Sequence, residues 1–285
     1  MKKLISLLSI MSIIFVTGCT IKDAYLLHAD VESQFVQPPL HLSNENQDES
    51  VKLNVHISGL TKHTSEGIIS KYNDNRYTDS LYNGKNFKWK SPSLNAGLDV
   101  DIKISRTFSF FGGLSYAGDD KSDGVGGNFG IGFRGGNSTS HFRLDIGANL
   151  QSTYYSAFYY ADAEFLPWAL DFSFVALEEN KKTNVNPFVS LTFNTSHNDW
   201  FANPFIQVSY LQQNLFKVKV GGGLALNDVY LESDISILNI KPGLSFVLGN
   251  NYFLSAGASM QFLLGVKDSN KDLFITPFVQ MNFGL

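Results

Sequence analysis

The 285-residue sequence has one cysteine, few charged residues and no long apolar run after its first twenty residues. Cys19 stands alone, so no disulfide can form within the chain. Charged residues make up 17%, against about 25% in a typical globular domain. The chain has 22 basic and 26 acidic residues and no basic cluster, which argues against a nucleic-acid partner. A membrane-spanning helix needs roughly 20 apolar residues in a row, and no segment supplies them.

The first eighteen residues have the pattern of a secretory signal peptide. Lys2 and Lys3 precede an uncharged apolar run that ends at Val16. The run continues into Val16-Thr17-Gly18-Cys19, which resembles the lipobox of bacterial lipoproteins. This resemblance implies cleavage before Cys19 and lipidation of that cysteine, with palmitate among the acyl chains. More than one acyl chain is needed for a stable membrane anchor. We therefore predict a signal peptide over 1–18 and a lipid anchor at Cys19.

Apolar and polar residues alternate through most of the chain after residue 90. In 93–104 (SLNAGLDVDIKI), every second residue is apolar over twelve positions, which indicates a β-strand. The same pattern predicts twelve strands: 51–58, 92–104, 106–117, 125–134, 140–152, 165–176, 184–194, 203–211, 215–226, 236–248, 251–264 and 272–285. Many of them have the roughly 9–11 residues of a transmembrane strand.

The connections between these strands alternate between tight and long. Those around Ser105 and at 135–139, 212–214 and 249–250 are tight, and 177–183 (LEENKKT) is an untidy member of the same set. Those at 59–91, 118–124, 153–164, 195–202, 227–235 and 265–271 are longer and more polar. Tight periplasmic turns and longer external loops are typical of outer-membrane barrels.

In these features the chain resembles the outer-membrane β-barrel proteins of bacteria that carry a lipoprotein signal. We predict an all-β fold, a closed antiparallel up-and-down transmembrane barrel of about twelve strands over 51–285, with ten as the lower limit. An even strand number puts both barrel ends in the periplasm, which agrees with an anchor in the inner leaflet. Candidate girdle aromatics near strand ends are Tyr116, Trp168, Tyr210 and Tyr252.

One eight-residue phrase occurs three times: NPFVSLTF from Asn186, NPFIQVSY from Asn203 and TPFVQMNF from Thr276. Each proline has the parity of the apolar face. Proline cannot donate to a strand ladder, so it belongs at the start of a strand, at an edge or at a bulge. We interpret the phrase as a structural repeat that marks the rim of the barrel.

If the apolar face points to lipid, the polar face lines the lumen. The predicted lumen-lining charges are Asp99, Asp101, Lys103, Arg134, Arg143, Asp145, Asp171, Lys217, Lys219 and Lys241. Buried charges must be paired, so an ion-paired lumen is one interpretation. A constriction with a slight basic excess and weak anion preference is the other. Residues 19–50, with a Gln37-Pro38-Pro39 kink, form either a periplasmic tether or a plug.

No catalytic residue, cofactor or metal site is predicted. The chain has no Gly-x-Ser-x-Gly elbow, and the acidic loop 119–124 departs from the calcium-loop pattern at Lys121 and Gly130. We therefore expect a protein that is not an enzyme. Its expected partners are outer-membrane lipid and the machineries for barrel assembly and lipoprotein processing, and its oligomeric state stays open.

Three functions stay open from the sequence. The first is a lipid-anchored narrow channel or structural surface barrel in the outer membrane. The second is a soluble periplasmic lipoprotein, a β-sandwich or lipocalin-like barrel that binds an apolar ligand. The third is a surface adhesin that acts through external loops, with 59–91 as the first candidate because of Tyr72, Tyr77, Tyr82 and Trp89.

Overall fold

A computed structural model describes residues 19–33, 37–42, 50–59, 64–69, 86–90, 94–118, 121, 123–165, 169–197, 200–221, 227–249, 252–267 and 273–285. The predicted signal peptide, Trp168 and the three tyrosines of the 59–91 loop lie outside these residues. Regular structure in the described part is β-strand. No helix within these ranges is long and apolar enough to cross a membrane.

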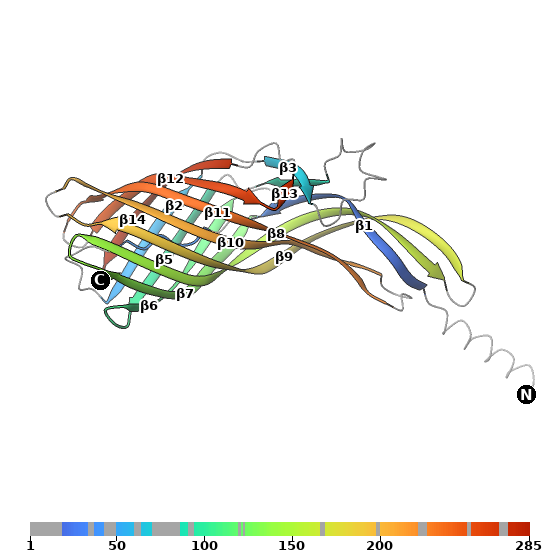
Figure 1. Ribbon diagram of the computed structural model, residues 1–285, viewed down its shortest axis with the longest axis horizontal. Coiled ribbons are helices and arrows are strands. Elements are labelled where there is room, and N and C mark those ends of the chain that lie inside the picture. The colour runs from blue at the N-terminus through green and yellow to red at the C-terminus, as the bar shows by residue number, and fades with distance from the viewer. Residues whose placement is uncertain are drawn as a thin grey trace, which may run out of the picture.

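Ten antiparallel strands close into a ring, in which each strand is hydrogen-bonded to two neighbours (Figure 1). In ring order they are β8 (Ser140–Phe165), β7 (Gly124–Gly136), β6 (Phe108–Gly118), β5 (Leu94–Lys103), β2 (Val51–Ser58), β14 (Leu273–Gly284), β12 (Tyr252–Leu264), β11 (Val229–Val247), β10 (Ala202–Val220) and β9 (Leu170–Thr195). Pairing of β8 with β9 closes the ring. Outside it lie β1 (Cys19–Ser33), β4 (Phe87–Lys90), β3 (Thr64–Ile69) and β13 (Val266–Lys267).

The strand number corrects the prediction of about twelve. Candidates 165–176 and 184–194 are both part of β9, and candidates 203–211 and 215–226 both fall largely in β10. The untidy link 177–183 is strand, paired with 152–158 of β8, and 212–214 pairs with β11. The charged and amide residues at 177–183 and 212–214 favour turns in the sequence pattern. Their backbones instead continue the ladder, because in a long hairpin such side chains can simply face solvent.

The two ends of the ring differ. At the turn end, short connections at 104–107, 137–139, 196–201 and 248–251 join the strands, and β2 begins where β14 ends. The connection 195–202, expected among the longer loops, therefore lies at the turn end. The opposite end of the ring is the loop end. There β8 to β11 continue far beyond the last residue pairs between β7 and β8 and between β9 and β10.

The outer face of the ring is apolar over its whole circumference. Its exposed side chains include Val55, Leu98, Phe110, Leu114, Phe129, Ile146, Val189, Ile206, Leu244, Ile275 and Val279. Tyr116, Tyr210 and Tyr252 are exposed with them. The inner face is polar, with buried Asn, Ser, Thr and Gln on every ring strand. This inversion of the usual soluble pattern is what a lipid environment requires of a barrel.

Past the loop end, the polarity reverses again in a segment that we name the extension. It comprises β1, β4 and residues 152–165, 170–184, 212–220 and 229–236 of β8 to β11. Its interior holds a core that includes Leu26, Val31, Trp89, Tyr155, Leu215, Phe216, Val218, Leu231 and Ile235. Burial of each large side chain stabilises it by about 1.5–3 kcal/mol. The extension thus has an apolar interior like that of a soluble protein. It continues from the loop end of a membrane-type barrel (Figure 1).

Each proline of the repeated phrase lies one position outside a ladder. Pairing of β9 with β10 spans Phe188↔Leu211 to Phe205↔Asn194, so it stops directly beside Pro187 and Pro204. Pairing of β14 with β2 likewise begins at Phe278, next to Pro277. On its other side each proline still faces a paired strand. Each proline, which has no N–H, therefore lies where its pairing with one of the two neighbouring strands stops. The missing donor limits how far that ladder extends.

Candidate functional site in the barrel lumen

Four charged side chains form a connected ion-pair network on the inner face of β5, β7 and β8. Arg143 donates from both terminal nitrogens to Asp101, at 2.6 and 3.0 Å. Its Nε donates to Asp145 Oδ1 at 2.6 Å. Arg134 adds a second guanidinium to Asp101 at 3.0 Å. Asp101, Arg143 and Asp145 are each at most 3% exposed, so these charges are held by one another rather than by water.

A second acidic site lies beside this network. Asp99 Oδ1 accepts from Asn128 Nδ2 at 2.5 Å, and Asp99 Oδ2 lies 3.2 Å from His56 Nδ1. Glycines make room for these side chains. A Cβ on Gly113 would collide with the carboxylate of Asp99, and a Cβ on Gly132 would collide with the guanidinium of Arg143. The inward glycines of β6 and β7 therefore have a steric reason: the charges occupy the space that side chains would fill.

The ten charges expected in the lumen divide between two places. Asp99, Asp101, Arg134, Arg143, Asp145 and Lys241 lie on the inner face of the ring, and Lys103 ends β5 on the same face. Asp171, Lys217 and Lys219 lie in the extension, half-exposed or more, where they pair with Lys22, Glu232 and Asp228.

The reason for that second placement is a change of register. The β10–β11 ladder shifts between Asn214 and Phe216. Before the shift, odd-numbered residues such as Gln213 point inward; after it, the buried residues are Phe216, Val218 and Val220. Lys217 and Lys219 consequently face solvent. Asp171 is on the part of β9 that extends past the ring.

Inside the ring lies the segment Gln37–Leu42, buried throughout. Side chains from four different strands donate to its backbone carbonyls. Gln207 of β10 reaches the oxygen of Pro39 at 2.7 Å, and Gln280 of β14 reaches that of Leu40 at 2.7 Å. Lys241 of β11 donates to Pro38 at 3.1 Å, and Lys52 of β2 donates to Leu42 at 3.3 Å. These four donors are at most 7% exposed.

The side chain of His41 connects the segment to the ion-pair network. Its Nδ1 lies 3.3 Å from Asp145 Oδ2, on the opposite wall from Gln280. Its ring packs on Phe111, with 5.0 Å between the ring centroids. Contacts to β2, β8, β10, β11 and β14 together surround the segment, because those strands are distributed around the whole ring.

The phenylalanines of the repeated phrase point into this lumen. Phe205 and Phe278 pack in one buried cluster with Leu40, Leu42 and Phe253. Their centroids lie 6.2 Å apart, in a tilted arrangement. The third, Phe188, lies 6.1 Å from Phe111. The phrase thus supplies apolar contacts to the buried segment as well as ladder ends.

Each of these inward rings lies opposite a glycine on the next strand. Phe188 pairs with Gly147, Phe205 with Gly243, Phe278 with Gly257, and Phe111 with Gly130. At all four glycines an added Cβ would lie 3.1 Å or less from a phenylalanine ring atom. Each phenylalanine ring therefore fills the space over a glycine where a side chain would otherwise lie. Aromatic rings cover glycines in designed sheets in the same way.

Sequence reasoning missed part of this site. Gln207, Gln280, Lys52 and His41 were not chosen, because neutral amides and single cations on a polar face look like ordinary lumen lining. The available signal was the Pro38-Pro39 pair: prolines have no N–H, so an extended proline segment offers carbonyls and calls for donors around it. Within the described ranges, no group of three His, Cys, Asp or Glu is placed to hold a metal ion.

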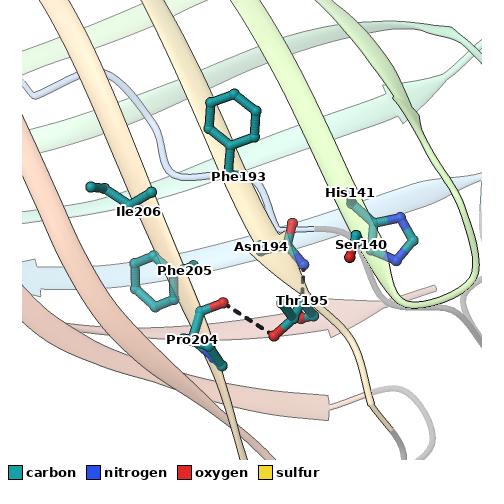
Figure 2. A pocket seen from close by; sticks show the side chains of 8 residues that line it. All are labelled: Ser140, His141, Phe193, Asn194, Thr195, Pro204, Phe205 and Ile206. Carbon is teal, nitrogen blue, oxygen red and sulfur yellow. Dashed lines mark hydrogen bonds between the residues drawn. The ribbon is translucent and has the colours of Figure 1, made fainter.

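A separate apolar pocket of about 440 Å³ opens on the outer wall at the turn end. Figure 2 shows its lining side chains from the ends of β8, β9 and β10. Phe193 and Ile206 flank it, and Thr195 donates to the carbonyl of Pro204 across it at 3.4 Å. It lies within the apolar belt of the ring.

No protein-family model matches the sequence, and no curated protein matches it. Solved structures that are similar to the chain include bacterial outer-membrane β-barrels. The outer-membrane protease OmpT of Escherichia coli has 10% identity and a TM-score of 0.43, over 84% of this chain and 97% of that one. The N-terminal barrel domain of Pseudomonas aeruginosa OprF has 9% identity and a TM-score of 0.30, over 82% of this chain and 97% of that one. The toluene transporter TbuX of Ralstonia pickettii has 8% identity and a TM-score of 0.35, over 85% of this chain and 91% of that one.

These matches correct one expectation. We expected a protein that is not an enzyme, on the ground that the chain has barrel architecture and lacks a familiar catalytic motif. A protease stands among the barrels that superpose on this chain, so that expectation was wrong. Barrel architecture is shared by enzymes and by transporters, and at such low identity the likeness concerns the fold alone.

Proposed function

We propose that this protein is a lipid-anchored outer-membrane barrel with an ion-paired lumen that its own segment Gln37–Leu42 keeps closed. Its role is that of a structural barrel that presents the extension at the membrane surface. The observation that carries the proposal is the set of four buried donors, on four strands, aimed at four carbonyls of one segment.

The energetics favour a stably closed lumen. A hydrogen bond contributes about 0.5–1.5 kcal/mol net, but a buried donor left without a partner costs about 1–3 kcal/mol. Removing the segment would take one acceptor from each of Gln207, Gln280, Lys241 and Lys52. A pocket between Gln37–Leu40 and the facing residues of β2, β11 and β14 has a volume of about 10 Å³, which is about the volume that one water molecule needs. A space of this size does not form a continuous pore beside the segment.

The alternatives have less support. A soluble sandwich or lipocalin-like barrel would expose apolar residues such as Leu114 and Val125 to water around the whole ring, at a large cost in free energy. An adhesin that acts through 59–91 would use residues that lie mostly outside the described part. A role in adhesion through the extension fits the surface barrel, because the extension is the part that projects beyond the ring.

The proposal also includes partners. Outer-membrane lipid would cover the apolar belt, the barrel-assembly machinery would insert the ring, and the lipoprotein-processing machinery would cleave before Cys19 and acylate it.

Cross-linking tests the closure. In a Cys19→Ser background, Leu40→Cys is combined with Gln280→Cys, and the folded protein is treated with a short cross-linker that carries two maleimide groups. The expected result is an intramolecular cross-link, seen as altered migration of the denatured, unreduced chain. The matched control combines Leu40→Cys with Val279→Cys, which lies one residue away on the outer face. Equal cross-linking in the two double variants, or none in the variant with Gln280→Cys, would contradict the proposal.

A further inference from the structure

We infer that the chain threads through its own barrel, so that β1 and Cys19 lie on the opposite side of the membrane from the C-terminus. The inference rests on the proposed lumen closure and adds the direction in which the chain runs. It makes the barrel a device that displays its own N-terminal strand at the loop end.

Strand β1 begins at one end of the molecule, and the C-terminus lies at the other (Figure 1). Cys19 pairs with Phe165, the last residue of β8, at the far tip of the extension. Leu285 donates its N–H to the carbonyl of Val51 at 2.9 Å, at the turn end of the ring. The C-terminus thus lies beside the start of β2, and Cys19 lies beyond the loop end.

The route between these points leads through the lumen. From Cys19, β1 runs antiparallel to β8 toward the ring and ends at Ser33, which pairs with Thr153 at the loop end. Gln37–Leu42 follows inside the ring, as its contacts show. The chain then reaches Ser50, whose carbonyl accepts from Lys103 N–H at the turn end, and β2 begins. The chain enters the ring at one end and leaves it at the other.

Strand β1 is firmly attached on the loop side. It pairs with β8 from Cys19 to Ser33, with two register shifts. Asn227, between β10 and β11, binds both backbone groups of Ile21, at 2.8 and 2.9 Å. At the other end of β1, Ser33 accepts from Trp89 Nε1 at 2.9 Å, and Glu32 pairs with Lys90 at 2.9 Å. These contacts hold both ends of β1 to the extension.

The inference gives the anchor a different position from the one that the sequence predicts. We expected acyl chains on Cys19 in the periplasmic leaflet, beside the C-terminus. With β1 paired along the extension, an acylated Cys19 would lie on the loop side instead, at the far tip of the extension. Leu170 and Phe172 are exposed beside it and would add to an apolar surface there.

Thiol labelling in intact cells tests the threading. Lys22→Cys places a thiol at an exposed position of β1, Lys121→Cys marks the loop end and Arg106→Cys marks the turn end. A membrane-impermeant maleimide is applied with and without permeabilisation of the outer membrane. Labelling of the unmodified protein measures any free thiol of Cys19. Should Lys22→Cys fail to fold, Asp30→Cys replaces it on the same strand.

The expected result is that Lys22→Cys reacts together with Lys121→Cys in intact cells, and that Arg106→Cys reacts only after permeabilisation. Reaction of Lys22→Cys under the same conditions as Arg106→Cys would overturn the threading. The cross-link between Leu40→Cys and Gln280→Cys separates the two proposals. If it forms while the labelling overturns the threading, the closed lumen still stands. If it does not form, both the closed lumen and the threading are wrong.

Discussion

Gln280 donates from Nε2 to the carbonyl oxygen of Leu40 at 2.7 Å, although 240 residues separate them in sequence. The same amide also donates to Asn282 Oδ1 at 2.6 Å. Gln207 makes the equivalent bond to Pro39 from β10, three strands from β14 around the ring. The barrel therefore holds its inner segment by the backbone. Pro38 and Pro39 suit this because they present carbonyl acceptors and have no N–H groups that would need acceptors in return.

Loss of Arg143 should strongly destabilise the barrel. Arg143→Met leaves Asp101 and Asp145 buried with one fewer cation, and breaking such a buried pair costs about 3–5 kcal/mol. We expect a matching decrease in the free energy of unfolding, measured by urea titration in detergent micelles. Lys181→Met is the control, because its pair with Asp123 is exposed and should contribute at most about 1 kcal/mol. Equal effects of the two substitutions would contradict the network.

Filling the space under a phenylalanine should loosen the inner segment. A Cβ on Gly243 would lie 2.9 Å from Phe205 Cε1 and 2.6 Å from the backbone oxygen of Ala256. We expect Gly243→Val to displace the ring, to destabilise the barrel by about 1–3 kcal/mol and to reduce cross-linking between Leu40→Cys and Gln280→Cys. Gly249→Ala meets only an ordinary contact with Tyr252 and serves as the control. Unchanged cross-linking in Gly243→Val would show that Phe205 does not hold the segment.

The extension should unfold without the ring. Phe216 is buried in the core of the extension, and Phe216→Ala should cost about 3–5 kcal/mol there. We expect an earlier transition in Trp89 fluorescence, measured with Trp168 and Trp200 replaced by Phe, while the ring keeps its resistance to detergent on unheated gels. Lys217→Ala, next in sequence and half-exposed, should shift the transition by no more than about 0.5 kcal/mol. Simultaneous loss of ring and extension would mean that they form one cooperative unit.

The extension should also lose stability at high pH. Burial and the hydrogen bond to Glu178 raise the pKa of Tyr155 from 10.0 to about 12. A raised pKa means that the folded state favours the protonated phenol, so its contribution is complete below pH 10 and is lost as the pH rises toward 12. Unfolding monitored by Trp89 fluorescence between about pH 9 and 12 should show this decline. Tyr155→Phe should flatten it, and an equally steep decline in that variant would assign the effect to other groups.

The sequence was sufficient for the class of fold and for the orientation of its faces. Alternation over twelve residues, as in 93–104, records which side of a strand meets lipid, because a charge on that side is costly at every position. It could not give the strand number. Lys181 and Lys182 look like turn residues, but in a hairpin that has left the membrane they face water while the backbone stays paired.

The site was less accessible from sequence for a related reason. Asp99, Asp101 and Arg143 have the parity of the lumen and could be chosen from it, whereas Lys217 has the same parity until one bulge at Asn214 reverses it. The link between Gln280 and Leu40 depends on ring closure, which no local pattern records. The Pro38-Pro39 kink was recognised as unusual, but tether and plug could not be separated without knowing what surrounds it.

Single-channel conductance in a planar bilayer tests the closed lumen most directly. Protein shown to be folded by its shifted migration on unheated gels should give no steady current. The variant with Gln207→Ala and Gln280→Ala, which removes two of the donors that hold the segment, should show openings. Gln212→Ala, on the exposed part of β10, should stay silent like the unmodified protein. Steady open steps from the unmodified, folded protein would contradict the account.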